Sequence, residues 1–167
     1  GEGAFAYSGL ETLDLGDQLT SIEWKVFMGT QLKEITIPDS VTNMDNSAFA
    51  GCDSLTTVTI GSGLVKMGFY DDDFRGCNSL TAINVDENNP VYTSVDGVLF
   101  NKKKTTLIQY PIGKTNSTYT IPDSVSFINE CSFWRNHNLK RINVNKKTIT
   151  EDFEDMCFCT HIKMNIK

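Results

Sequence analysis

The residues best suited to chemistry lie near the C-terminus, where Cys157, Cys159 and His161 alternate with other side chains. Thiolate and imidazole groups are ligands for soft metal ions such as zinc. A fourth ligand is not evident, however, and zinc sites usually space their cysteines more widely. A degenerate terminal repeat explains the cluster more simply, so we predict no metal and no cofactor.

Signatures of catalysis are missing from the sequence as well. His137 and His161 fall at positions of a repeat rather than beside a nucleophile. The chain contains no glycine-rich phosphate loop, serine elbow or zincin motif. A thiol enzyme that uses Cys157 or Cys159 is the alternative, and we predict that the chain is not an enzyme.

Three further groups carry weaker chemical signals. Cys52 and Cys77 recur at one repeat position, which brings them within disulfide range, but buried free thiols are the interpretation we favour. Five cysteines are an odd number, so at least one thiol is unpaired. Asp71–Asp73 suits calcium or a solvated acidic loop, and we favour the loop. Asn116 begins a glycosylation sequon, which matters only in a eukaryotic secretory pathway.

Composition excludes several classes of partner. The chain has 167 residues, a net charge of −6 and 40% apolar residues, which is enough for one buried core. An acidic chain repels nucleic-acid phosphates, and the longest basic run is only Lys102–Lys104. No apolar stretch approaches the roughly 20 residues that span a bilayer. We predict no nucleic-acid partner, no membrane insertion and no signal peptide in the chain as given.

The elements that must position these residues form a tandem repeat. The pattern Leu-x-x-Leu-x-Leu recurs with successive copies 22 to 25 residues apart, except for one step of 36. Copies begin at Leu10, Leu32, Leu55, Leu80 and Leu139, with a worn copy at His161 and a partial copy at Tyr119. A phenylalanine precedes the leading leucine at Phe5, Phe27, Phe49, Phe74 and Phe133. One unit cannot bury these side chains alone, so the units are expected to stack as a solenoid.

Each unit predicts one strand and one short turn. Alternation in Val58-Thr59-Ile60 is typical of a half-buried strand, and the proline of Ile37-Pro38-Asp39-Ser40 ends a strand. The stretch 46–49 predicts a helical or 3₁₀ turn. We therefore expect a single leucine-rich-repeat domain over 1–167 with about seven units. Its parallel sheet occupies one side, and helical turns and loops occupy the other.

Two insertions interrupt the period. Residues 69–73 predict a bulging outer loop. The step of 36 places an insertion near 86–118, in which Val98–Phe100 and Leu107–Tyr110 flank the polar stretch 101–105. This pattern predicts a β-hairpin with a cationic tip that stands off the solenoid while its bases continue the stack.

The repeat resembles a known family. Thr36-Ile37-Pro38-Asp39-Ser40-Val41 recurs unchanged at 120–125, and Phe49-Ala50-Gly51-Cys52-Asp53-Ser54-Leu55 nearly recurs at 74–80. Together they are similar to the BspA-like leucine-rich repeats found on surface proteins of mucosal anaerobic bacteria and some protozoa. The segment 96–111 is similar to an insertion that recurs in that family. The resemblance implies a secreted or cell-surface location and adhesion to host or bacterial surface proteins.

The outward-facing positions of the strands are the predicted binding surface, because solenoids present such faces to partners. The alternative is that threonine and asparagine merely suit a solvated strand. The predicted binding residues are Thr12, Asp14, Glu34, Thr36, Thr57, Thr59, Asn84, Thr120, Arg141 and Asn143.

Two expectations about the whole protein follow. The preferred function is a non-enzymatic protein-binding module, and the alternative is a structural spacer within a longer surface protein. The chain opens inside a unit, so we expect neighbouring repeats to be lost at the N-terminal end. Phe5 and Leu10 would then be partly exposed, or covered by end-to-end self-association.

Overall fold

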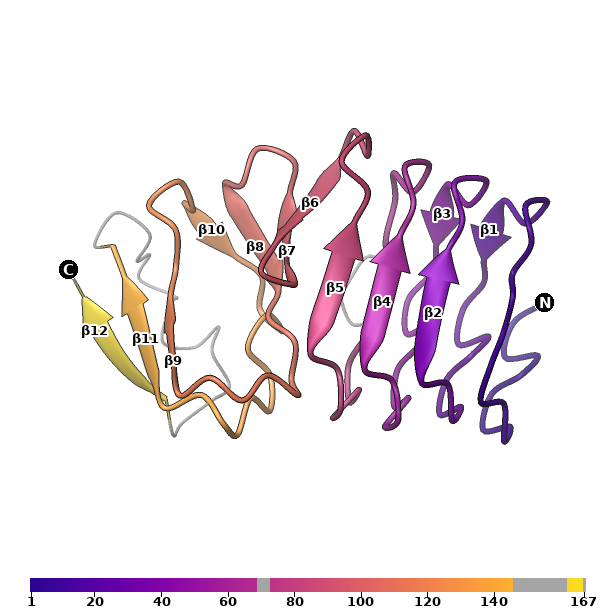
Figure 1. The fold of residues 1–167 in the computed structure, drawn as a ribbon, viewed down its shortest axis with the longest axis horizontal. Helices are drawn as coiled ribbons and strands as arrows, with labels where there is room; N and C mark the ends of the chain where they lie inside the picture. The colour runs from indigo at the N-terminus through magenta and orange to yellow at the C-terminus, as the bar shows by residue number, and fades with distance from the viewer. Residues whose placement is uncertain (69–72, 146–161, 167) are drawn as a thin grey trace.

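The protein is a solenoid of short stacked strands (Figure 1). The computed structural model describes residues 1–68, 73–145 and 162–166. The strands are β1 (Ser21–Ile22), β2 (Glu34–Ile37), β3 (Asn43–Met44), β4 (Thr57–Ile60), β5 (Ala82–Val85), β6 (Tyr92–Val95), β7 (Val98–Asn101), β8 (Thr106–Gln109), β9 (Thr118–Thr120), β10 (Phe127–Ile128), β11 (Arg141–Val144) and β12 (Lys163–Ile166).

Parallel pairing at the repeat spacing confirms the predicted solenoid with a sheet on one side. β2, β4 and β5 form one three-stranded sheet, and β9, β11 and β12 form another. The expected sheet is therefore two pieces, one on each side of the insertion. In Figure 1 the strands of the first piece lean one way, whereas β11 and β12 lean the other way.

A second strip of strands lies apart from these two sheets. β1 pairs with β3, and Asn43 bridges onward to Lys66. Farther along, β8 pairs with β10 in the same parallel sense. The first copy of the repeat, residues 10–15, forms no strand, and Phe5 is 48% exposed beside the partly buried Leu10.

The prediction of helical turns is wrong for the residues that the structure describes, since these contain turns and no helix. Two residues hold a positive φ in each of the first three turns, as at Lys25 (55°) and Gly29 (67°). A left-handed residue at that spacing prevents a right-handed helix from forming. The N–H groups of Lys25, Phe27 and Gly29 instead donate to carbonyls of the next unit, so neighbouring turns are hydrogen-bonded to each other.

Aromatic rings stack through the core. Phe5, Phe27, Phe49 and Phe74 follow one another with centroid distances of 5.8, 5.3 and 6.0 Å. Tyr110 then occupies the phenylalanine position in the insertion, 5.5 Å from the ring of Phe133. The aromatic row therefore resumes beyond the break in the repeat.

The insertion contains the predicted hairpin, because β7 and β8 pair antiparallel, and β6 adds a third strand. It does not stand off the solenoid. Leu99 and Ile108 belong to the N-terminal core, whereas Phe100 and Leu107 belong to the C-terminal core. Because side chains alternate along a strand, the hairpin buries both faces and joins the two cores.

A buried asparagine fastens this insertion to the preceding units. Asn89 is fully buried, and its Nδ2 donates to the carbonyls of Gly61 and Leu64, both at 2.9 Å. Its Oδ1 accepts the N–H groups of Val91 and Tyr92 at 2.9 and 2.8 Å. The side chain is fully hydrogen-bonded, which is what burial of an amide requires.

A row of buried small polar side chains, one in each of several turns, donates hydrogen bonds to backbone carbonyls of the preceding unit. Cys52 and Cys77 are buried free thiols that donate to the carbonyls of Phe27 and Phe49, each at 3.1 Å. The nearby Cys52 thiol and burial together raise the pKa of Cys77. Asn136 occupies the same position after the insertion and donates to Tyr110 at 3.3 Å. The row binds one unit to the next through backbone carbonyls.

Several sequence candidates lie outside the described residues. These are Cys157, Cys159 and His161, together with Asp71 and Asp72 of the acidic loop. Among the residues that are described, no cluster of three metal-binding side chains occurs. The same part of the chain contains no helix long and apolar enough to cross a bilayer.

Candidate functional site

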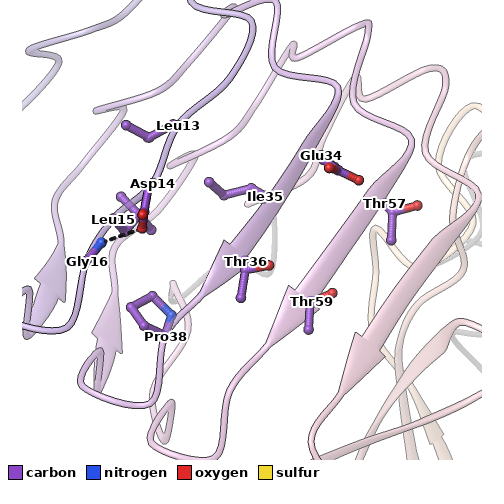
Figure 2. Close-up of a pocket in the computed structure, with 10 residues that line it drawn as sticks. All are labelled: Leu13, Asp14, Leu15, Gly16, Glu34, Ile35, Thr36, Pro38, Thr57 and Thr59. Carbon is purple, nitrogen blue, oxygen red and sulfur yellow. Dashed lines mark hydrogen bonds between the residues drawn. The ribbon is translucent and has the colours of Figure 1, made fainter.

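A shallow groove of about 340 Å³ gathers five of the predicted binding residues (Figure 2). Asp14 lies on the segment before the first strand, and Glu34 and Thr36 project from β2. Thr57 and Thr59 come from β4, directly beside them in register. Alternation places Ile35 and Val58 in the core, so the intervening residues must face outward.

The polar groups of the groove are largely unused by the protein. Asp14 Oδ1 accepts the N–H of Gly16 at 2.9 Å, as the dashed line in Figure 2 shows. The side chains of Glu34, Thr36 and Thr59 make no hydrogen bond with any described residue. Their hydroxyl and carboxylate oxygens are therefore available to a ligand.

A second groove of about 430 Å³ continues the first at the strand ends. The two share Thr36 and Thr59, and the second adds Asn84, Asp39 and Asp86. Asp39 accepts the N–H of Ser62 at 2.6 Å, which fixes its carboxylate at the rim. We call the surface formed by Asp14, Glu34, Thr36, Thr57, Thr59 and Asn84 the open face.

The remaining predicted residues lie elsewhere. Thr120, Arg141 and Asn143 belong to the sheet beyond the insertion, and Thr12 is exposed but lines neither groove. Asn143 Nδ2 donates to Thr120 Oγ1 at 2.9 Å, and Asn165 Nδ2 donates to Asn143 Oδ1 at 3.1 Å. We call this chain of three side chains the amide ladder.

Acidic and basic residues are distributed unevenly between the two halves of the chain, and the boundary between the halves lies within the insertion. Residues 1–100 carry 15 acidic and four basic side chains, whereas residues 101–167 carry six and 11. Within the sheets, Glu34 belongs to the first piece, and Arg141 and Lys163 are neighbours in the second. A charged partner therefore meets opposite fields at the two ends of the solenoid.

Sequence reasoning missed the acidic rim of the second groove. Asp39 follows the proline that ends β2, and Asp86 directly follows β5. The signal was available, because an aspartate just past a strand end stays near that sheet edge. Alternation within a strand identifies inward and outward positions only, and it does not identify the residue that follows the strand.

The comparisons with known proteins decide the family. A sequence model of the BspA type leucine rich repeat region matches six copies, over residues 1–120 and 113–166. The chain belongs to the BspA-type leucine-rich repeat family. The predicted resemblance is therefore confirmed.

Solved structures share the fold of this BspA-type protein. The pneumococcal vaccine antigen PcpA is 29% identical, with a TM-score of 0.68, over 87% of this chain and 42% of the antigen. A leucine-rich cell surface protein from Faecalibacterium prausnitzii is 25% identical, with a TM-score of 0.69, over 84% of this chain and 37% of the other.

A more distant structure covers nearly the whole chain. A leucine-rich repeat protein from Eubacterium ventriosum is 22% identical, with a TM-score of 0.73, over 98% of this chain and 50% of the other. The BspA-type chain thus spans half or less of the length of each of these proteins. No curated protein sequence gives a significant match.

Proposed function

We propose that this BspA-type chain is a non-enzymatic protein-binding module of a secreted or cell-surface protein, and that the open face is its binding surface. The observation that carries the proposal is the groove that assembles Asp14, Glu34, Thr36, Thr57 and Thr59. It offers carboxylates and hydroxyls on a rigid sheet, a preorganised arrangement for contacts with a protein ligand. No cofactor takes part.

The names of two similar structures support a surface location. One is a vaccine antigen and another is a leucine-rich cell surface protein. Adhesion to host or bacterial surface proteins is the role that fits such a location.

Binding to purified matrix proteins tests the open face. Fibronectin, laminin and collagen are immobilised, and the wild-type chain is passed over each one. We expect at least one to bind, and we expect Glu34→Arg and Thr57→Arg to lower that affinity. Asn43→Arg is the matched control, because Asn43 is exposed on β3 outside the open face. Equal affinity of all variants would contradict the proposal.

A structural spacer is the second candidate, and the amide ladder favours it. In that ladder the polar side chains bond to one another across the strands. A spacer binds none of the three matrix proteins, and its removal from a longer surface protein changes only the reach of the remaining domains.

We further propose end-to-end self-association through the N-terminal end. A hollow of about 280 Å³ there is lined by Phe5, Leu13, Leu15 and Leu19 among other residues. Sedimentation velocity should show a concentration-dependent dimer that Phe5→Ser weakens. A strictly monomeric wild type at high concentration would contradict this contact.

A further inference from the structure

Two guanidinium groups contact a single indole on the turn side of the solenoid. The Cζ atoms of Arg75 and Arg135 lie 4.5 and 4.4 Å from the ring centroid of Trp134. Arg75 precedes the insertion, whereas Trp134 and Arg135 follow it, in the turn between β10 and β11. The fold of the insertion therefore creates this cluster, which we call the arginine–tryptophan stack.

Neither arginine has an acidic partner in the part of the chain that the structure describes. The one ion pair there joins Lys33 to Glu11. No side-chain hydrogen bond involves either guanidinium among these residues. Both side chains are exposed, so two like charges share one ring, and no acidic side chain of residues 1–68, 73–145 and 162–166 pairs with either of them. A bound anion would relieve their mutual repulsion.

Arg135 lies at a turn position that is also left-handed in the first four units, where Tyr7 and three glycines occupy it. Arg135 holds a φ of 54° at the position where earlier units have Gly29, Gly51 and Gly76, with φ of 67° to 78°. A residue with a Cβ is strained in this region, whereas glycine is not. Tyr7 holds a φ of 59° at the same position of the first unit, so this strain is a feature of the repeat. At Arg135 it accompanies a guanidinium whose Cζ lies 4.4 Å from the ring centroid of Trp134.

We propose that the arginine–tryptophan stack binds carboxylate groups of an acidic protein segment. A guanidinium pairs a planar carboxylate through two parallel N–H···O bonds, and stacking on an aromatic ring holds it ready for that contact. The excess of basic residues after residue 100 favours the approach of an acidic segment to this half. This site is separate from the open face and does not depend on it.

Fluorescence of Trp134 provides the direct test. The chain has two tryptophans, so Trp24→Phe leaves Trp134 as the sole indole reporter. This variant is titrated at constant ionic strength with an oligoglutamate peptide and with an oligoglutamine peptide of equal length. We expect a saturable change with oligoglutamate and none with oligoglutamine. Identical responses to the two peptides would overturn the proposal.

Substitutions separate binding from folding. In the Trp24→Phe background, Arg75→Gln and Arg135→Gly should each weaken oligoglutamate binding about tenfold. Arg135→Gly also removes the backbone strain, so its melting temperature should be equal to or higher than that of the background variant. Lys25→Gln is the matched control, because Lys25 is also a cationic residue with a positive φ but lies in another turn. Unchanged affinity in both arginine variants would overturn the site.

A sulfated glycan is the competing ligand, and the same titration distinguishes it. A heparin oligosaccharide is added to the Trp24→Phe variant in place of the peptide. Weaker binding of heparin than of oligoglutamate at equal charge supports an acidic protein segment. Tighter binding of heparin, or a response to heparin alone, would overturn that assignment.

Discussion

The open face and the amide ladder occupy equivalent positions of the same repeat, yet they use their polar groups differently. Thr36 and Thr59 are neighbours in register, but their hydroxyls make no hydrogen bond to each other. Thr120 and Asn143 are neighbours in the same way, and they do bond. A threonine hydroxyl is short, whereas an asparagine amide is long enough to reach across the strand spacing and can donate and accept at once.

This difference teaches how one repeat can serve two purposes. In the amide ladder, asparagine side chains join adjacent units and use up polar groups of the face, whereas Asn84, in register beside Thr59 on the open face, makes no such bond. Threonine leaves the face free for a partner, while the buried rows beneath provide the stability. Substitutions that remove a buried side chain, or a polar side chain from either face, test this comparison.

Phe49→Ala should have the largest effect, because it removes a fully buried ring from the middle of the aromatic row. The expected loss is about 3–5 kcal/mol of unfolding free energy. Urea denaturation measures it, with Thr59→Ala as the outward-facing control that should change little. Equal losses for the two variants would refute the inward and outward assignment on which the open face depends.

Asn89→Ala should have the next largest effect. The substitution leaves two carbonyls of the preceding units and two N–H groups of the insertion without their buried partner, at a cost of about 3 kcal/mol. Asn88→Ala is the control, because Asn88 is exposed. Hydrogen exchange should show faster exchange across β6 and β7 in Asn89→Ala alone. Retained protection would show that the insertion does not depend on this side chain.

Asn143→Ala tests the amide ladder itself. It removes hydrogen bonds to Thr120 and Asn165, so we expect a loss of about 1–2 kcal/mol, more than for Thr59→Ala at the equivalent place on the open face. Thermal and urea unfolding compare the two variants. A smaller loss for Asn143→Ala than for Thr59→Ala would erase the distinction between the two faces.

The smallest effect concerns the Lys33–Glu11 ion pair, whose atoms lie 2.8 Å apart. The hydrogen bond from Lys33 lowers the pKa of Glu11, so any stabilisation is present above the usual carboxyl range and is lost as the pH falls through the lowered pKa. Because both side chains are exposed, Lys33→Gln should leave the melting temperature unchanged. NMR titration should show the pKa of Glu11 returning to its ordinary value in that variant. A fall in melting temperature would reveal a structural role for this surface pair.

Alternation made the outward positions of the strands predictable, and the repeat spacing made their stacking predictable. The same reasoning failed at the turns, because a residue such as Ser47 gives no sign in its type that it will adopt a positive φ. It also failed at the insertion. Val98-Leu99-Phe100 is a continuous apolar run, which is typical of a strand buried on both faces, and that signal was overlooked.

For the candidate site, the sequence indicated which residues face outward but not which of them bond to one another. Spacing alone does not distinguish the free hydroxyl of Thr59 from the bonded amide of Asn143, because Asn84 lies opposite Thr59 in register just as Asn143 lies opposite Thr120, yet only the second pair is hydrogen-bonded. The repeat spacing likewise did not indicate that Tyr110 joins the aromatic row, because Tyr110 lies within the insertion that breaks the period.

The opposite lean of the two sheet pieces bears on how a ligand engages the solenoid. In Figure 1 the strands change direction at the insertion, and the hairpin that joins the two cores fixes that change. The two pieces of the sheet therefore present their outward side chains along differently slanted strands. A ligand with two linked contacts, one for each piece, would gain avidity from the whole length of the solenoid.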